Sequence, residues 1–581
     1  MGGFWGPELK FAGYDNLIIR GKSPSWVYLW INNDKVEFRD ASHLLGKGIR
    51  ETTELLKQEL KDDRAQVACI GPAGENKVVM ASIEASRASA AKGAGVIMGD
   101  KKLKAIVVRG TKHDINIAHP AELFEYCSGL MKRWLEHPEV RGRKAHSQSP
   151  EGGFGAFHLE GLSWGNSRER RRGFWNEDER KNYLELEKKY MSGLMSCYNC
   201  PNGCVDVVNY PGIPPYFLKC WSIDGYRMGA MSDFDFELKI CGIAHDYGMD
   251  SWSTPLVVAL GLELYDAGIL TDKDMPGIPS DQTERFEWLL HKIVRREGIG
   301  DILANGSYWA ARQIGGEAIA YDHSCIRKEE NHPIKLGFLN YTYYLQWATN
   351  EKKAITQIQG PYPQDPRPTR EQREEFVKSW DAVPYQRLVD NYLVWEPRGH
   401  ESIQHACDVC DYNETTKYWE DALGLCKFWA STGGYHLHTL PKIISLATGM
   451  DMDEAELWKI AHRNRNLLRG INARLGWNRS LEEQIPEDHW SRREPEVEKQ
   501  LLDEYYAFKG WNDEGIPTRE TLHNLDLDYV AEDLERRGIL KKETLVREAK
   551  FPEGRGILPK DSLTRTGEPL SIATLSRRVS M

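Results

Sequence analysis

The chain has 581 residues, of which 41% are hydrophobic, so it is long enough to bury more than one hydrophobic core. Its formal net charge of -10 gives no general attraction to nucleic acid or to an anionic membrane surface. No apolar run has the length of a membrane span, and the first residues lack the pattern of a signal peptide. The 11 cysteines, an odd number, fit a reducing compartment. We therefore expect a large globular protein of the cytoplasm that binds no nucleic acid.

The first hundred residues have the pattern of a β-sheet with a few helices. Short runs rich in β-branched and aromatic residues are separated by turn residues such as Gly and Asn. One helix is expected within this region, at residues 41–61. The expected strands are residues 15–20, 26–31, 66–70 and 105–109.

From about residue 119 onward, apolar residues recur with the period of an α-helix. The clearest helical segments are residues 120–126, 254–264, 285–296 and 453–466. The order of elements predicts an α+β fold. We expect a strand-rich domain at residues 1–118, followed by mainly helical domains at residues 119–345 and 346–581.

Three closely spaced cysteines are the strongest chemical signal, in Cys197-Tyr-Asn-Cys200-Pro-Asn-Gly-Cys204. A loop with this spacing can direct three thiolates onto three irons of one [4Fe–4S] cluster, and its Pro and Gly favour a bend over regular structure. The fourth iron needs a thiolate from elsewhere in the fold. We assign that ligand to Cys426, which ends the segment Asp421-Ala-Leu-Gly-Leu-Cys426.

Zinc is the alternative to an iron–sulfur cluster at this loop. A pair of cysteines separated by two residues is also half of a common zinc site, which normally combines two such pairs. Cys407 and Cys410 have the spacing of a second half-site. The sequence favours the cluster, because the loop supplies a third cysteine.

Two glycine-rich segments, residues 70–76 and 92–105, flank predicted strands. Glycines in such turns let backbone N–H groups approach a ligand, and the lysines of the second segment suit a phosphate. Neither segment matches a P-loop or a Rossmann fingerprint. On residue chemistry alone, steric need at tight turns is the favoured explanation of these glycines.

Six segments, taken in order, resemble the motif set of the aldehyde ferredoxin oxidoreductase family. The resemblance extends from the first residues to about residue 430. Members of that family hold tungsten or molybdenum between two pterin dithiolenes, beside one [4Fe–4S] cluster. The six segments are residues 2–10, 70–76, 93–105, 197–204, 247–250 and 421–426.

The resemblance implies a role for individual residues. Cys197, Cys200, Cys204 and Cys426 would bind the cluster, and segments around Asp250 and Asp421 would each hold one pterin at the domain junction. An ionised carboxylate suits this task, because it can accept two hydrogen bonds from the paired N–H groups of a pterin edge. Mg²⁺ between the pterin phosphates is also expected. The full set of implied cofactor-binding residues is Gly93, Gly95, Asp246, Asp250, Asp421, Gly424 and Leu425.

The sequence departs from the family pattern in three places. Relatives usually carry a further strand-rich segment before the first motif, so we expect this chain to be shortened at its N-terminus. His245 stands where the first pterin motif often opens with Asp. Cys220 stands where aldehyde-oxidising relatives tend to carry a Glu close to the metal. A soft thiolate there can bind tungsten, as in the catalytic subunit of tungsten-dependent benzoyl-CoA reductases, whereas the alternative is a small buried residue.

Three histidines are candidates for proton transfer, because the pKa of imidazole lies near working pH. His158 follows a glycine-rich aromatic stretch, and His400 and His405 precede the last predicted cluster cysteine. A hydrogen-bonded structural histidine is the alternative for each.

The sequence predicts an oxidoreductase that interconverts an aldehyde and a carboxylic acid, with ferredoxin or a ferredoxin-like subunit as electron partner. The second hypothesis is a low-potential reductase of an aromatic acyl-CoA, for which Cys220 is the distinguishing residue. The third is a non-catalytic iron–sulfur subunit for electron transfer. A homo- or hetero-oligomer is expected in each case.

Overall fold

The computed structural model divides the chain into two compact units. Unit 1 comprises residues 1–116, 141–335 and 574–581, and unit 2 comprises residues 117–140 and 336–573. The structure describes residues 2–85, 88–91, 93–136, 163–164, 177–200, 205–219, 233–322, 324–330, 334–335, 341–350, 403–426, 437–484, 494–541 and 578–580.

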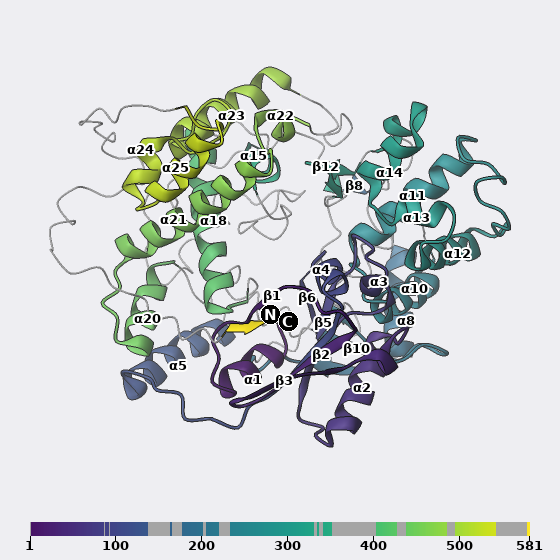
Figure 1. The fold of residues 1–581 in the computed structure, drawn as a ribbon, viewed down its shortest axis with the longest axis horizontal. Helices are drawn as coiled ribbons and strands as arrows, with labels where there is room; N and C mark the ends of the chain where they lie inside the picture. Colours follow the sequence, from purple (N-terminus) through teal and green to yellow (C-terminus); the bar gives the residue numbers. More distant parts are fainter. Residues whose placement is uncertain are drawn as a thin grey trace. The chain divides into compact units, whose positions relative to one another are not determined.

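A six-stranded sheet forms the N-terminal part of unit 1 (Figure 1). Its strand order is β3-β2-β7-β4-β5-β6, and β2 and β7 are parallel whereas the other neighbours are antiparallel. The strands are β2 (Val27–Asn32), β3 (Lys35–Asp40), β4 (Gln66–Cys69), β5 (Ile83–Ala85), β6 (Ala88–Ala91) and β7 (Leu103–Arg109).

Side chains of β2 pack on both faces of this sheet, as alternation along a strand requires. Leu29 and Ile31 share a core with Trp5 of α1 (Trp5–Phe11). Tyr28 and Trp30 share a second core with residues of α2 (Ile49–Leu60). The sheet therefore lies between two apolar layers, which explains why β2 and β7 read as largely apolar runs.

Three short helices and one further strand surround the sheet in the described part of this region. The elements are η1 (Ser42–Leu44), α3 (Pro72–Glu75), α4 (Gly95–Asp100) and β1 (Ile18–Arg20), which pairs in parallel with β15 (Arg578–Ser580).

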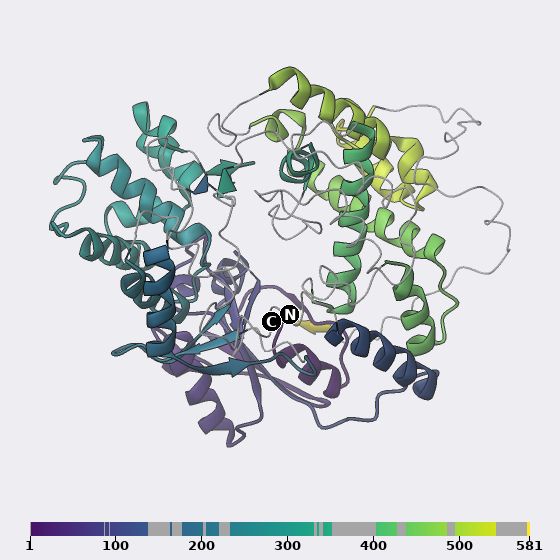
Figure 2. The ribbon, with the colours of Figure 1, turned by 180° about the vertical axis from the view of Figure 1, so that it is seen from behind.

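The rest of unit 1 combines a small antiparallel sheet with packed helices. The sheet has the order β11-β10-β9, from β9 (Met191–Met195), β10 (Val205–Val208) and β11 (Tyr216–Lys219). The central helix is α11 (Ser253–Asp266), whose first 12 residues are all buried. Figures 1 and 2 show α11, α12 and α13 side by side. The other elements are α8 (Glu177–Tyr190), α10 (Phe234–Asp246), α12 (Gln282–Arg295), α13 (Ile299–Leu303), α14 (Ser307–Ile314), η2 (Gly316–Tyr321), and the paired strands β12 (Cys325–Ile326) with β13 (Glu329–Glu330) and β8 (Ser163–Trp164) with β14 (Ile334–Lys335).

Unit 2 is helical where the structure describes it. Its longest helices are α18 (Ile403–Leu423) and α21 (Glu454–Arg474), which contact each other, and α18 also contacts α15 and α23. The remaining elements are α5 (Pro120–Glu136), α15 (Tyr341–Thr349), η4 (Leu437–Thr439), α20 (Leu440–Thr448), α22 (Arg479–Glu482), α23 (Pro495–Lys509), α24 (Arg519–Asn524) and α25 (Asp528–Arg536).

The predicted α+β fold is confirmed, and most predicted elements are present. Three of the four expected strands correspond to β2, β4 and β7, whereas the run at residues 15–20 forms a strand only from Ile18. The expected helix at residues 41–61 begins only at Ile49, after the short η1 helix. The division into three domains stays a prediction.

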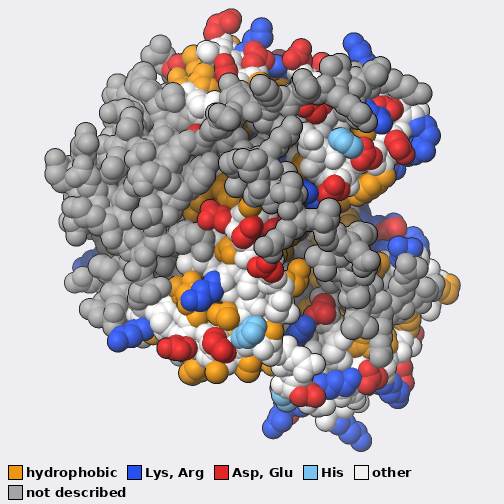
Figure 3. Space-filling view, turned by 90° about the vertical axis from the view of Figure 1, so that its left-hand side faces the viewer, with side chains coloured by type: hydrophobic (Ala, Val, Ile, Leu, Met, Phe, Trp, Pro, Cys, Tyr) orange, Lys and Arg blue, Asp and Glu red, His pale blue; other side chains and the backbone are white. Residues whose placement is uncertain are grey.

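On the described part of the face shown in Figure 3, Lys and Arg side chains lie among Asp and Glu side chains. Within the described residues, no helix combines the length and the apolar character of a membrane span.

Candidate functional site

The predicted cluster cysteines of unit 1 lie in the loop that joins β9 to β10. Cys197 and Cys200 form a tight turn, in which the Cys200 N–H donates to the Cys197 carbonyl over 3.1 Å. Asn199 completes the turn with a φ of 52°, a conformation that Asn tolerates better than most residues. The two thiols are therefore held at one end of a hairpin. Cys204 and Cys220 lie outside the described residues.

The N-terminal motif holds this loop in place. The Gly3 N–H donates to the Cys197 Sγ over 3.1 Å, and the Tyr198 N–H donates to the Gly3 carbonyl, also over 3.1 Å. Trp5 anchors the motif to the sheet, because its Nε1 donates to the Ile106 carbonyl over 3.0 Å. Sulfur ligands of iron–sulfur clusters accept such N–H bonds, so this half of the loop fits the predicted cluster.

Two further motif segments, residues 247–250 and 93–105, meet at residues 80–82 of unit 1. The loop after α10 pairs with the segment before β5, through Asp250 N–H to Met80 carbonyl (2.9 Å) and Ser82 N–H to Gly248 carbonyl (2.8 Å). The second glycine-rich segment joins at the same place, where the Gly95 N–H donates to the Ala81 carbonyl over 3.1 Å. The first pterin motif and a glycine-rich segment are thus adjacent through backbone bonds.

Close backbone approach explains several motif glycines. A Cβ on Gly99 would lie 1.8 Å from the Gly74 carbonyl oxygen, and one on Gly71 would lie 2.4 Å from the Tyr247 carbonyl oxygen. Gly93 has a φ of 70°, which side-chain-bearing residues rarely adopt. Packing therefore accounts for glycine at residues 71 and 99, and backbone conformation accounts for it at residue 93. Cofactor binding by Gly93 and Gly95 stays a prediction.

The two acids of the first pterin motif occupy different environments. Asp250 is buried, and its Oδ2 accepts the Ser253 N–H over 2.7 Å at the start of α11. Asp246 Oδ1 accepts the Arg50 N–H over 3.1 Å, at the first turn of α2. Gly48 precedes that helix and has no side chain to cap it, so Asp246 serves as the cap from a distance in sequence. Pterin binding by either acid stays a prediction.

Glu84 is a residue beside this motif that the sequence did not single out. It is buried on β5, and its Oε2 lies 3.9 Å from the Nδ1 of His245. Ser82 Oγ donates a hydrogen bond to its other oxygen. In the sequence, Glu84 is marked by being an acidic residue between the apolar residues of β5.

In unit 2, residues 421–426 form the predicted second pterin motif, which lies at the C-terminal end of α18. Gly424 has a φ of 69° and the Leu425 N–H donates to the Glu420 carbonyl over 2.8 Å, which is the Schellman pattern of helix termination. Asp421 Oδ1 lies 3.1 Å from Lys417 Nζ, and Cys426 is exposed just beyond the helix. The spacing of the motif thus places its Asp on the last helical turn and its Cys after the stop.

Of the three candidate histidines for proton transfer, the described residues include His405. His405 lies on α18 near its start, and its side chain is not described. An α-helix rises about 1.5 Å per residue, so His405 and Asp421 are about 24 Å apart along the helix axis. His158 and His400 lie outside the described residues.

The zinc alternative receives no support from Cys407 and Cys410. Both thiols are buried on α18, and burial raises the pKa of each well above its ordinary value. Cys410 Sγ donates to the Glu414 Oε1 over 3.8 Å. Cys410 is thus engaged as a thiol donor to Glu414 inside the core of unit 2.

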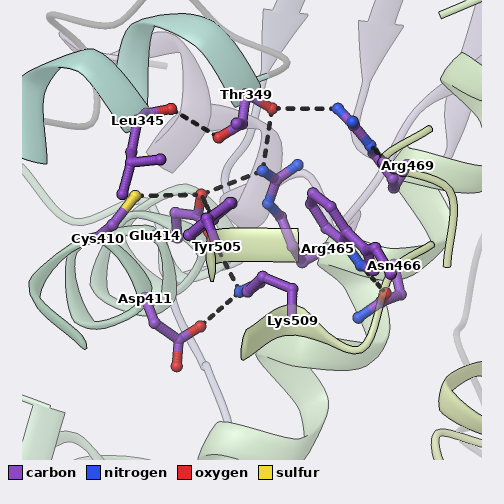
Figure 4. Close-up of polar contacts among 12 residues, drawn as sticks. Leu345, Thr349, Cys410, Asp411, Glu414, Arg465, Asn466, Arg469, Tyr505 and Lys509 are labelled. Atoms are coloured by element: carbon purple, nitrogen blue, oxygen red, sulfur yellow. Dashed lines mark hydrogen bonds and ion pairs between the residues drawn. The ribbon is translucent and has the colours of Figure 1, made fainter. Parts of the chain in front are cut away.

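A buried network of charges lines a cavity of ≈ 330 Å³ between α18, α21 and α23 (Figure 4). Lys509 Nζ lies 2.5 Å from the Asp411 Oδ1 and 3.0 Å from the Glu414 Oε2. His462 Nε2 lies 3.0 Å from the same Asp411 oxygen, and Tyr505 donates to the Glu414 Oε1 over 2.6 Å. The cavity extends along α18 to Asp421, so the network lies next to the second pterin motif.

The charges of this network stabilise one another. Burial alone would raise the pKa of Asp411, but His462 and Lys509 lower it well below its ordinary value. Burial alone would lower the pKa of Lys509, but Asp411 and Glu414 raise it. Both groups therefore stay charged near neutral pH.

Comparison with known proteins identifies the family. A profile described as "Aldehyde ferredoxin oxidoreductase, N-terminal domain" matches residues 1–110, and one described as "Aldehyde ferredoxin oxidoreductase, domains 2 & 3" matches residues 125–527. The chain belongs to the aldehyde ferredoxin oxidoreductase family. The predicted resemblance is confirmed, and so is the assignment as an oxidoreductase.

Two relatives from this family share one name and match most of the chain. The tungsten-containing aldehyde ferredoxin oxidoreductase of Pyrococcus horikoshii is 29% identical over 556 residues, which cover 91% of this chain and 84% of that protein. The enzyme of the same name from Pyrococcus abyssi is 30% identical with the same coverage.

A solved structure is more similar in sequence than these relatives. It is described as the active site complex BamBC of benzoyl coenzyme A reductase in complex with 1,5-dienoyl-CoA. Its matching chain is 47% identical, with a TM-score of 0.86, and the match covers 93% of this chain and 86% of that chain.

The capping role of Asp246 predicts a stability change. Asp246→Ala should lower the free energy of unfolding by about 1 kcal/mol, because the first turn of α2 loses its acceptor. Asp233→Ala is the matched control, because Asp233 caps α10 in the same way. Urea denaturation measures both, and an unchanged Asp246→Ala midpoint would contradict the cap. Tungsten content should fall only in Asp246→Ala, and equal content in both variants would refute pterin binding by Asp246.

The buried network predicts a larger effect in unit 2. Lys509→Met should lower the free energy of unfolding by about 3–5 kcal/mol, because it leaves two buried carboxylates without their shared cation. Lys459→Met is the control, since Lys459 pairs with an exposed Asp526 and should cost less than about 1 kcal/mol.

The effect of Lys509→Met should depend on pH. The folded pKa of Asp411 is lowered, so its stabilising contribution is complete above the pKa of an unfolded carboxyl, about 4, and is lost as pH falls below it. Denaturation at several pH values should show the difference between wild type and variant shrinking in acid. A difference that grows in acid would refute the charge assignment.

Proposed function

We propose that the chain is a tungsten bis-pterin, [4Fe–4S] reductase of an aromatic acyl-CoA. The observation that carries this proposal is the 47% identity to a chain of a benzoyl coenzyme A reductase complex, against 29–30% for two aldehyde ferredoxin oxidoreductases, at similar coverage. The reaction adds two electrons and two protons to the aromatic ring of the thioester and yields a dienoyl-CoA.

The residues of this chain would divide the work of holding the cofactors. Cys197, Cys200, Cys204 and Cys426 would bind the cluster. The donor set fits, because the Cys197 sulfur accepts a backbone N–H within a preformed turn. When bound, the pterin-held metal and the cluster supply the low-potential electrons that the ring requires.

The pterins would be held by acids at the ends of helices. Asp250 would accept N–H groups of one pterin from its place before α11, and Asp421 those of the other from the last turn of α18. Gly93, Gly95, Asp246, Gly424 and Leu425 complete the proposed pterin-binding set, with Mg²⁺ between the pterin phosphates.

Cys220 is the proposed protein ligand of the tungsten. Its soft thiolate suits that metal, and the similarity to the benzoyl coenzyme A reductase complex favours a ligand over a small packing residue. Protons for the ring would come from His158, His400 or His405, which stay candidates for that role.

Oxidation of an aldehyde to a carboxylic acid is the second candidate function. The family profiles and the names of the relatives from Pyrococcus favour it. Family membership also favours an enzyme over the non-catalytic electron carrier that the sequence left open. Molybdenum is the alternative metal in either function.

The electron partner would be ferredoxin or a ferredoxin-like iron–sulfur subunit, in a homo- or hetero-oligomer. The structure with 47% identity is a complex, which supports a partner subunit. We place the protein in the cytoplasm.

The two candidate functions make different predictions for Cys220→Ser. Protein purified without oxygen should oxidise a reduced viologen in the presence of benzoyl-CoA, and Cys220→Ser should abolish this activity because the metal loses its thiolate. Cys127→Ser is the control, since Cys127 lies on α5 and belongs to none of the six motif segments of the sequence. Viologen reduction that depends on an aldehyde and persists in Cys220→Ser would overturn the proposal in favour of the second candidate.

A further inference from the structure

Gly3 makes two hydrogen bonds to the cluster loop, one as donor and one as acceptor. Its N–H donates to the Cys197 Sγ and its carbonyl accepts the Tyr198 N–H, each over 3.1 Å. The two bonds hold the first predicted cluster ligand and its neighbour against the N-terminal motif.

The backbone of Gly3 needs a left-handed conformation to do this. Its φ is 82°, in the region that side chains with a Cβ disfavour. Glycine at this position therefore allows the backbone conformation in which its N–H points at the Cys197 sulfur.

Three aromatic side chains pack together beside the contact between Gly3 and the cluster loop. The Tyr198 ring lies between Phe4 and Phe11, with centroid distances of 6.0 Å and 5.7 Å and edge-to-face geometry. Phe11 also packs on His113, with centroids 4.5 Å apart. We call Phe4, Phe11 and Tyr198 the aromatic clamp. Because Tyr198 lies between two predicted cluster ligands, the clamp fixes the turn itself.

We propose that Gly3 is a positioning residue that raises the reduction potential of the cluster through its hydrogen bond to Cys197. Reduction adds one electron to the cluster, and an N–H directed at a ligand sulfur stabilises the added negative charge. The inference rests on the cluster of the proposed function, and it adds the residue that tunes the potential.

The direct test is an EPR-monitored redox titration of Gly3→Ala. The variant should keep its iron and show a more negative midpoint potential than wild type, because the Cβ moves the N–H away from the sulfur. Gly193→Ala is the matched control, since Gly193 lies on the strand before the loop and a Cβ there meets nothing within 4 Å. Its midpoint should equal that of wild type.

A spectroscopic measurement identifies the bond itself. After exchange into D₂O, the reduced wild-type cluster should show hyperfine coupling to an exchangeable deuteron, and Gly3→Ala should lose this signal. An unchanged midpoint together with an unchanged deuteron signal would overturn the inference.

A second variant covers the case in which Gly3→Ala fails to retain iron. Phe4→Leu removes one ring of the aromatic clamp and leaves the backbone of Gly3 free to form its bonds. It should shift the midpoint in the same direction by a smaller amount, with Tyr198→Phe unchanged as its control. An unchanged Phe4→Leu midpoint would then refute the inference. Wild-type protein without a cluster signal would instead refute the cluster of the proposed function.

Discussion

Direct backbone contact between segments that lie far apart in the sequence is the constraint on which the site in unit 1 depends. Gly3 bonds to both Cys197 and Tyr198, and Gly248 bonds to Ser82. The Gly248 contact leaves no room for a side chain, since a Cβ there would lie 2.8 Å from the Gly71 N, and the same holds where Gly99 meets Gly74. The family motifs are therefore glycine-rich for packing reasons, and the chemical residues lie at fixed offsets from the contacts. Loops held in this way can present sulfur and carboxylate groups without regular structure of their own.

The sequence predicted the parts of this arrangement that depend on local chemistry. Strands buried on both faces appear as apolar runs such as that of β2, and the cysteine spacing indicates the loop without knowledge of the fold. Contacts between distant segments could not be predicted. Asp246 caps a helix almost two hundred residues earlier in the chain, and only the folded backbone reveals it.

The charged network of unit 2 illustrates a different limit of sequence interpretation. Asp411 and Glu414 are one helical turn apart, as are His462 and Arg465, which is the usual pattern of solvated helix faces. In the structure these stripes face each other and neutralise one another beside a cavity. Charge pattern alone cannot separate the two cases, because the deciding factor is which helices pack together. The network ties the middle of α18 to α21 and α23 through ion pairs of Asp411 and Glu414.

The proposed function requires four thiolates, those of Cys197, Cys200, Cys204 and Cys426, to bind a single cluster. The most direct test compares iron content and the EPR spectrum of protein purified without oxygen for wild type, Cys426→Ser and the control Cys127→Ser. Wild type and the control should each contain about four irons and give the signal of a reduced [4Fe–4S] cluster. Cys426→Ser should lose iron or change that signal. A Cys426→Ser variant with full iron content and the wild-type spectrum would contradict the account.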